Sequence, residues 1–316
     1  MKKMVLRITG IIATVIFMTV MISLIAFFPR DLSTDQLPFA PVMDEQQQAD
    51  VDKKNEYLES VGTYMKGLLA GDLGTTSKGE KVKDLIAENI PRSLFLLSAA
   101  FMISVFIGVP FGVWLSRRQG RIWNEFKRWL TIIFQSLPDF FFIILLQYIA
   151  ILLVRAGFDS LPPAGFRKPE QSILPIIALS FVPTLYLIRI TMQAIENCLP
   201  EQYIRTAFGK GLSTPQVVVR HAFKNSLVQV IDNIPYLMVI MLSNLLLVEY
   251  IFYYPGAVYR MFVTMDAQQL QLSGFSDKLG EPEILASTAI IFSLLFIAIY
   301  LISRGLRKWV DPRLRG

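Results

Sequence analysis

Cysteine and histidine each occur once in this 316-residue chain, as Cys198 and His221. A single cysteine cannot form an intrachain disulfide, so cysteine usage says nothing about the redox compartment. A single histidine excludes a His-rich metal site and makes any histidine-based triad depend on one residue. We therefore expect no metal site and no catalytic residues.

Phosphate-binding sequence motifs are also missing. No G-x-x-x-x-G-K-[ST] pattern occurs, so the chain does not bind ATP through a P-loop. The H-E-x-x-H pattern of zinc proteases does not occur either. We expect the chain to bind no cofactor itself and not to be an enzyme.

Charged residues make up only 18% of the chain, whereas hydrophobic residues make up 53%, and the mean hydropathy is +0.47. The formal net charge of +6 could suggest nucleic acid as a partner. The basic residues, however, cluster at the ends of long apolar runs, as they do in membrane proteins. These features predict an all-α membrane protein and argue against nucleic-acid binding.

Six apolar segments are long enough to cross a bilayer, which takes about 20 residues in a helix. We interpret the first as a retained helix rather than a signal peptide, because it is longer than a typical signal-peptide core and lacks a small-residue cleavage site. The six predicted spans are Ile8–Phe28, Leu94–Leu115, Leu130–Val154, Ile173–Ile190, Val230–Phe252 and Ile284–Ile302.

The connections between the spans differ in charge, which predicts their orientation. Residues 117–128 and the tail 304–316 are rich in lysine and arginine and are placed in the cytoplasm. Acidic residues outnumber basic ones in 29–92, and 253–283 is also acid-leaning, so both are placed outside. With six spans, both termini lie in the cytoplasm.

The connection 189–229 is the one long segment predicted on the cytoplasmic side. Helix-forming residues from Glu201 onward stop at Gly211, a plausible helix C-cap at which the chain reverses. Ser213 or Thr214 can then cap a second helix whose first position is Pro215. This pattern predicts two short helices around a glycine turn, a shape suited to docking into a groove of a partner.

The same connection resembles the EAA loop of bacterial ABC-importer permeases of the oligopeptide, dipeptide and nickel type. The resemblance is carried by Tyr203-Ile-Arg-Thr-Ala-Phe-Gly-Lys-Gly-Leu-Ser213 and Arg220-His-Ala-Phe-Lys-Asn-Ser-Leu227. Gly71-Asp-Leu-Gly74, Val248-Glu-Tyr-Ile-Phe-Tyr-Tyr-Pro-Gly256 and Asp311-Pro-Arg-Leu-Arg315 match the same family in order. Gly71-Asp-Leu-Gly74 in a long first outer loop is more similar to the B-type subunit than to the C-type.

The resemblance implies the type I ABC importer permease fold in a bacterial inner or plasma membrane. The implied parts are an N-terminal transmembrane helix (1–28), an extracytoplasmic loop (29–93), a core permease domain (94–303) and a cytoplasmic tail (304–316). The core would contain five transmembrane helices and the coupling loop within 189–229.

The resemblance also implies partners and a cargo. The partners would be a second permease subunit, two cytoplasmic ATPases that bind ATP and magnesium, and an extracytoplasmic substrate-binding protein. Peptides are the leading substrate class, with nickel or other metal chelates and opines as alternatives.

Within the loop, Leu212, Pro215, Val217 and Val218 are expected to supply apolar contact to the ATPase, while Arg220 and Lys224 position the loop near acidic groups or lipid head groups. His221 could shuttle protons, but a polar packing role fits its place in the loop better. The candidate coupling residues are Tyr203, Arg205, Ala207, Lys210, Gly211, Leu212, Ser213, Pro215, Val218, Arg220 and His221.

Polar residues inside the spans are candidates for the translocation path, because they are costly in a bilayer. Asp139 follows Pro138, whose missing N–H can kink the third span, so Asp139 either lines the path or caps the helix that restarts there. Glu249 has a simpler interpretation, a water-exposed place at the membrane interface. The path candidates are Pro138, Asp139, Gln147, Asn244 and Glu249.

Two other classes compete with the permease. A secondary transporter is expected to show internal repeats and broken helices with ion ligands, and no convincing repeat is visible. An intramembrane enzyme needs a nucleophile and base or a metal site, for which this chain offers little.

Overall fold

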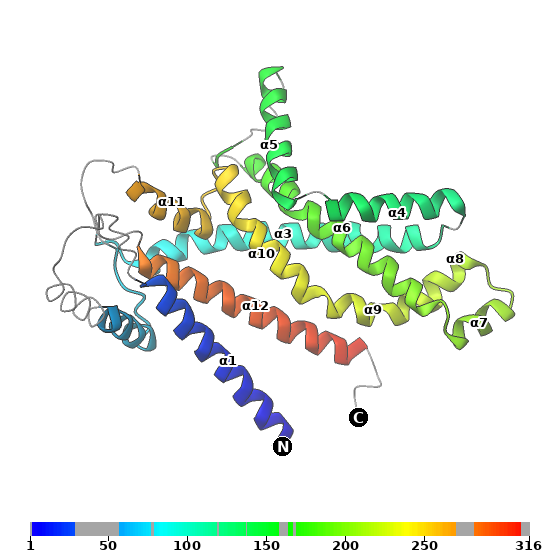
Figure 1. Ribbon diagram of the computed structural model, residues 1–316, viewed down its shortest axis with the longest axis horizontal. Helices are drawn as coiled ribbons and strands as arrows, with labels where there is room; N and C mark the ends of the chain where they lie inside the picture. The colour runs from blue at the N-terminus through cyan, green and yellow to red at the C-terminus, as the bar shows by residue number, and fades with distance from the viewer. Residues whose placement is uncertain are drawn as a thin grey trace, which may run out of the picture. The chain divides into compact units, whose positions relative to one another are not determined.

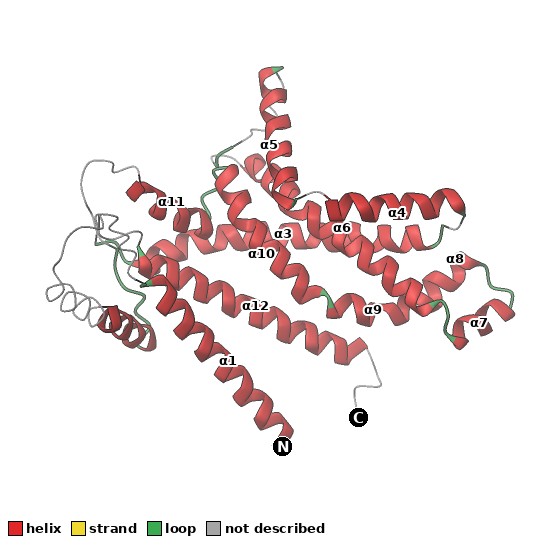
Figure 2. Ribbon diagram, viewed as in Figure 1, coloured by secondary structure: helices red, strands yellow, loops and turns green. Residues whose placement is uncertain are grey.

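A computed structural model describes most of the chain, and every regular element in the described part is helical (Figure 2). The described residues are 2–28, 57–76, 79–118, 120–136, 138–157, 164–166, 169–269 and 281–310. The predicted motif Asp311–Arg315 lies outside them. Two compact units are recognised: Met1–Pro91 with Arg260–Leu294, and Arg92–Tyr259 with Leu295–Gly316.

The helices follow one another along the chain with short connections in most places (Figure 1). A helix over 57–69 precedes α3, and a 3₁₀ turn, η1, and a π-helical turn, η2, complete the set. The elements are α1 (Lys2–Ala26), α3 (Val82–Ser116), α4 (Arg121–Ser136), α5 (Asp139–Arg155), η1 (Pro169–Ser172), α6 (Ile173–Cys198), α7 (Gln202–Gly209), α8 (Thr214–Val217), η2 (Val218–Ala222), α9 (Phe223–Asp232), α10 (Ile234–Ile251), α11 (Ala257–Gln269) and α12 (Pro282–Val310).

Among the described residues, five helices are long and apolar enough to cross a membrane, and they lie in α1, α3, η1 with α6, α10 and α12. They correspond to five of the six predicted spans. Helices α3 and α6 are longer than predicted: α3 begins 12 residues before Leu94, and α6 continues to Cys198. At about 1.5 Å per residue, α3 exceeds the hydrocarbon thickness of about 30 Å, so its polar first turns extend beyond the apolar segment.

The third predicted span, Leu130–Val154, is wrong as a single helix. Helix α4 ends at Ser136 and α5 begins at Asp139, with Pro138 in extended conformation between them (φ −62°, ψ 139°). Pro138 cannot donate a backbone hydrogen bond, and its ring disfavours helix at the preceding residue. Because α5 is only 17 residues long, the count of six spans and the side of each terminus stay predictions.

The first unit is held by small apolar clusters near the start of α12. Ala26 of α1 and Tyr64 pack with Ala286 and Ile290, and the Tyr64 hydroxyl lies 2.9 Å from Ser287 Oγ. The Gly71-Asp-Leu-Gly74 motif forms a tight turn, in which the Asp72 carboxylate accepts the Gly74 N–H at 3.0 Å.

In the second unit, α6 is the central helix and packs against α5, α9 and α10. The backbone of α3 also approaches α6 closely. A Cβ added to Gly108 would lie 2.8 Å from Leu187 Cβ, and one added to Gly112 would lie 2.7 Å from Thr191 Cβ. Glycines permit this close helix contact, which is typical of membrane proteins.

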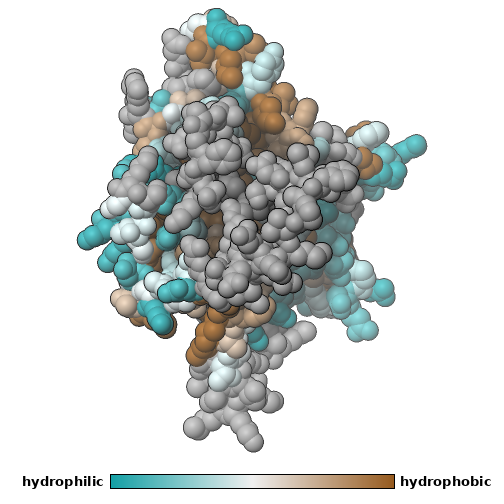
Figure 3. Space-filling view, turned by 60° about the vertical axis from the view of Figure 1, so that its left-hand side comes forward, coloured by the Kyte–Doolittle hydropathy of each residue, from teal (hydrophilic) through white to brown (hydrophobic). Residues whose placement is uncertain are grey.

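Large apolar side chains remain exposed on the spans, including Phe17 of α1 and Phe106 of α3. In Figure 3, hydrophobic patches lie beside hydrophilic ones on the coloured residues of one face. Such exposure is expected where a helix faces lipid rather than water.

Candidate coupling loop and translocation path

The chain reverses direction after α7 in the way that the glycine predicted. Helix α7 ends at Gly209, and Gly211 adopts φ +81°, a conformation that side chains disfavour. The Gly211 N–H donates to the Phe208 carbonyl at 2.9 Å, which satisfies one of the free carbonyls at the helix end. The predicted glycine turn is confirmed.

The second helix of the loop begins at the predicted cap. Ser213 is the N-cap of α8, and its backbone N–H donates to the Gln216 side-chain oxygen at 3.0 Å. Pro215 lies in the first turn, where no backbone N–H is needed. From α8 the chain continues through η2 into α9, so the second helix of the loop is longer than predicted and contains a π turn. Such turns occur frequently at functional sites.

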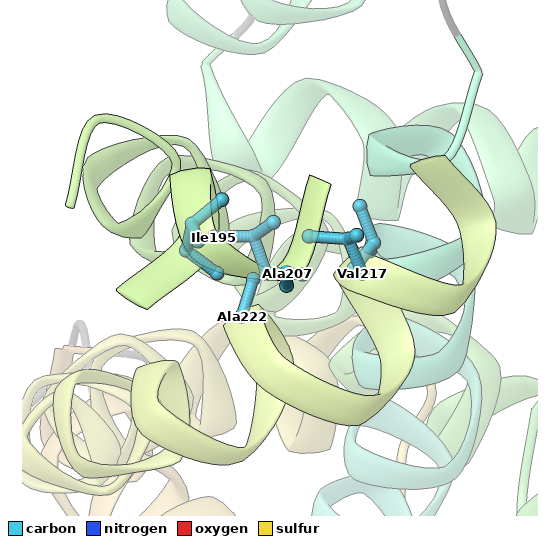
Figure 4. Packing of buried hydrophobic residues seen from close by; sticks show 6 residues of the cluster. Ile195, Ala207, Val217 and Ala222 are labelled. Carbon is cyan, nitrogen blue, oxygen red and sulfur yellow. The ribbon is translucent and has the colours of Figure 1, made fainter. Parts of the chain in front are cut away.

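A small apolar core holds the loop together at the end of α6. Figure 4 shows side chains from α6, α7, α8 and η2 converging on one another. Each core residue is nearly or fully buried, and Leu212 and Phe223 pack against the cluster from its edge. The core consists of Ile195, Ile204, Ala207, Val217, Val218 and Ala222.

The expectation that Val217 and Val218 contact a partner is wrong. Both are 0% exposed, because they fill the core of the loop, and Ala207 is buried there as well. Leu212 and Pro215 are only partly buried and keep some accessible surface. The exposed apolar side chains of the loop are Tyr203 (39%), Phe208 (42%) and Val219 (44%).

Phe208 and Val219 were missed by the sequence analysis. Helical spacing could not have found Phe208, because a residue four positions after buried Ile204 is expected on the same helix face, yet its side chain is 42% exposed. Spacing could not have found Val219 either, since the π turn changes the spacing after Val218.

The charged candidates of the loop lie on its surface. Arg205, Lys210, Arg220 and Lys224 are exposed, and His221 is half-buried in the π turn. Burial raises the pKa of the Tyr203 hydroxyl above its usual value. The exposed surface of the loop is therefore basic with three apolar side chains.

Two of the path candidates, one on α5 and one on α10, form a hydrogen bond that links the two helices. The Asn244 amide of α10 donates to the Asp139 carboxylate at 3.2 Å. Asn244 is buried and Asp139 is exposed, in the first turn of α5 directly after Pro138. A carboxylate there also interacts favourably with the positive end of the helix dipole. Both roles foreseen for Asp139 remain compatible with this position.

Gln147 reaches the C-terminal end of α10, where its amide nitrogen donates to the Ile251 carbonyl at 2.5 Å. That carbonyl belongs to the last turn of α10, whose acceptors lack helical partners. The structure therefore brings four of the five path candidates to α5 and the facing α10: Asp139, Gln147, Asn244 and Glu249.

Glu249 is not water-exposed, so the interfacial interpretation is wrong. Its side chain is 0% exposed, and Ser93 Oγ donates to one carboxyl oxygen at 2.5 Å. The other oxygen accepts the backbone N–H groups of Val258 at 3.0 Å and Tyr259 at 2.8 Å. Glu249 thus caps the first turn of α11, where helices leave free N–H groups.

The chain between α10 and α11 is shaped around this carboxyl. Tyr253 has φ +51°, and the Tyr254 N–H donates to the Glu249 carbonyl at 2.9 Å. A Cβ on Gly256 would collide with the Glu249 carboxyl, so only glycine fits. Ser93 also accepts the Ala257 N–H at 2.8 Å. The motif Val248–Gly256 is therefore one structural unit. Sequence analysis missed Ser93, which is distant in the sequence and has no motif of its own.

Comparison with known proteins settles the family. Residues 108–316, which contain the coupling loop, match the model of the binding-protein-dependent transport system inner membrane component. The chain belongs to this family. It is an ABC-importer permease of the inner membrane, with several membrane-spanning helices, as the sequence resemblance of the loop predicted.

Curated relatives of this permease cover most of its length. It is 27% identical over 254 residues to a dipeptide transport system permease protein of Lactococcus lactis, covering 80% of this chain and 78% of that protein. It is 28% identical over 271 residues to an oligopeptide transport system permease protein of Bacillus subtilis, covering 82% and 79%.

A solved structure has a similar fold. The permease matches a chain of the MetNI methionine ABC transporter in inward-facing conformations with a TM-score of 0.53 and 16% identity. The match covers 72% of this permease and 96% of that chain. The type I importer permease fold is therefore confirmed.

Proposed function

We propose that this permease forms half of the pore of an ATP-driven peptide importer. The relatives named above are a dipeptide and an oligopeptide permease, which supports peptides as the cargo. The other half is a second permease subunit, an extracytoplasmic protein delivers the substrate, and two cytoplasmic ATPases bind ATP and magnesium. Nickel or other metal chelates and opines are the alternative cargo.

The loop from Glu201 to Val228 is the proposed docking site for an ATPase. The observation that carries this proposal is the contrast between its closed core and its exposed apolar surface. Tyr203, Phe208 and Val219 are exposed outside the membrane-spanning segments, where a soluble surface would gain by covering them. The exposed cations Arg205 and Lys210 would meet acidic groups on the partner.

The buried core gives the loop its proposed mechanical role. Because Ile195 of α6 packs directly with Ile204 and Val217, the loop moves together with the end of α6. A push from the ATPase would therefore rotate packed helices rather than bend a flexible segment, as in hinge and shear transitions. Asp139 and Asn244 would line the path that these helices open and close.

The test compares Phe208→Ser with Leu69→Ser in the intact transporter. Both substitutions remove an exposed apolar side chain, but Leu69 (88% exposed) belongs to the other compact unit, outside the loop. We expect Phe208→Ser to reduce both co-purification of the ATPase and ATP-dependent uptake of a labelled dipeptide in proteoliposomes, and Leu69→Ser to leave both unchanged. Full co-purification and uptake with Phe208→Ser would contradict the docking site.

The wild-type protein distinguishes the wider alternatives. If no ATPase co-purifies and uptake persists after ATP depletion, the importer proposal fails in favour of a secondary transporter. If uptake depends on ATP but is inhibited by a nickel chelate rather than by unlabelled dipeptides, the peptide assignment fails while the importer proposal stands.

A further inference from the structure

An apolar groove lies where the end of α3 meets the start of α4, and its residues belong neither to the coupling loop nor to the path candidates. Four aromatic rings line it. Trp114 meets Trp123 edge to face at a centroid distance of 5.4 Å, Phe111 stacks on Trp114 at 5.2 Å, and Phe126 meets Trp123 edge to face at 6.1 Å. The groove has no polar lining, and its walls are Phe111, Trp114, Ile122, Trp123 and Phe126.

Arg118 is held over the two tryptophans. Its guanidinium carbon lies 5.1 Å from the Trp114 ring centroid and 5.3 Å from that of Trp123. These distances are typical of cation–π interactions. Arg118 is nevertheless solvent-exposed, so a guanidinium placed by the rings keeps N–H groups for an outside acceptor.

The groove is part of the folded second unit. Trp114 and Trp123 pack against a buried cluster formed by Leu115, Ile188 and Met192. Lys127 of α4 forms an ion pair with Glu196 of α6 at 3.8 Å, which holds α4 and its groove residues Trp123 and Phe126 against α6. The groove therefore exists before any ligand arrives.

The surroundings indicate the chemistry of the occupant. Helix α3 is a membrane-span candidate that ends at Ser116, so a bilayer crossed by α3 would place the groove near the boundary between hydrocarbon and head groups. Arg117, Arg121 and Arg128 follow within 12 residues of that end and are exposed like Arg118. Clusters of basic residues immediately beyond a span attract anionic lipids.

We propose that this groove binds an anionic phospholipid. The acyl chain lies against the aromatic walls, and the head-group phosphate accepts hydrogen bonds from Arg118. Arginine suits this role because its planar fork can donate two parallel hydrogen bonds to a phosphate while its face stacks on an aromatic ring. Both kinds of lipid carry a phosphate, so the charge of Arg118 separates them: the choline of a zwitterionic head group cancels the phosphate charge, whereas an anionic head group keeps it. The neighbouring arginines attract anionic lipid to this surface.

Tryptophan fluorescence in lipid bilayers tests the proposal, because two of the four tryptophans line the groove. Trp129→Phe and Trp309→Phe in the full-length chain leave Trp114 and Trp123 as the reporters. The protein is reconstituted into phosphatidylcholine bilayers containing increasing fractions of brominated phosphatidylglycerol or brominated phosphatidylcholine. Bromine quenches a tryptophan that it contacts, so half-maximal quenching measures occupation of the groove by each lipid.

We expect brominated phosphatidylglycerol to quench at a mole fraction about fivefold lower than brominated phosphatidylcholine, the ratio expected for one basic side chain at the surface. Arg118→Gln should bring the half-quenching mole fractions of the two lipids close together. Arg118→Lys should retain most of the preference for the anionic lipid because the charge remains. Arg155→Gln, which removes an exposed charge at the end of α5, is the matched control and should change nothing.

Equal quenching by the two lipids in the wild-type groove would overturn the proposal, as would a full preference in Arg118→Gln. Absence of quenching by either lipid would also overturn it, since the groove would then be covered by protein. Equal elution volume and melting midpoint of the variants show that a lost preference does not come from unfolding.

Discussion

Replacing Glu249 by alanine tests whether its buried carboxyl fixes the start of α11. The wild-type carboxyl accepts one hydrogen bond from Ser93 and two from the backbone N–H groups of Val258 and Tyr259. Ser93 can turn its hydroxyl toward a carbonyl of its own helix, but the two backbone donors have no comparable choice. Each buried donor left without a partner costs about 1 to 3 kcal/mol, so the free energy of unfolding should fall by about 2 to 6 kcal/mol.

The melting midpoint of the detergent-purified protein measures the loss. For a protein of this size, each kcal/mol shifts the midpoint by about 2 °C, so Glu249→Ala should melt roughly 4 to 12 °C lower. Hydrogen exchange should also accelerate at Val258 and Tyr259. Glu249→Gln keeps one acceptor oxygen, so its melting midpoint should fall less than that of Glu249→Ala. Glu59→Ala removes an exposed carboxyl and should leave the melting midpoint unchanged. An unchanged midpoint and unchanged exchange in Glu249→Ala would refute the capping role.

Three further substitutions test the loop and the helix packing. Gly211→Val should reduce coupling of ATP hydrolysis to uptake, because a branched residue is strained at φ +81°. Gly211→Asn should stay close to wild type, because asparagine tolerates positive φ. Equal activity of the two variants would contradict the proposed need for a left-handed turn at Gly211. A Cβ at Gly211 meets open space, so the cost of a side chain there comes from the backbone conformation and not from a collision. Ile204→Ala should destabilise the loop by about 2 to 5 kcal/mol, seen as faster proteolysis within it, while exposed Gln202→Ala should not. Gly112→Val should lower the melting midpoint through collision with Thr191 and the Ile188 carbonyl, whereas Gly10→Val, with open space around it, should not.

The sequence was sufficient where a local rule decides the structure. Gly211 and Ser213 end and restart helices through their own backbone and side-chain chemistry, so their roles could be predicted from neighbouring residues. Five spans could be predicted because lipid requires long apolar helices. The Pro138 break was only foreseen as a kink, since the extent of a proline distortion depends on what the two helix halves pack against.

Tertiary packing decided the parts that could not be predicted. Glu249 near a helix end reads as a surface residue until Ser93, 156 positions away, and the α11 backbone enclose it. Val217 and Val218 are apolar like the exposed Val219, and only the meeting of α6, α7 and η2 shows which of them face inward. Burial of a short segment depends on contacts with distant residues, which residue type alone does not reveal.

The second unit offers a continuous structural route from the coupling loop to the polar residues of α10. Helix α9 leaves the loop and ends at Asp232, and α10 begins two residues later at Ile234. The residue between them, Asn233, is held on both sides: its amide donates to the Gln229 carbonyl at 2.8 Å, and its oxygen accepts the Tyr186 hydroxyl of α6 at 2.6 Å. Because this joint is tied to α6 as well as to α9, it resists bending at the break. If an ATPase moves the loop as proposed, α10 should therefore move with it and carry along Asn244 and the Glu249 cap of α11.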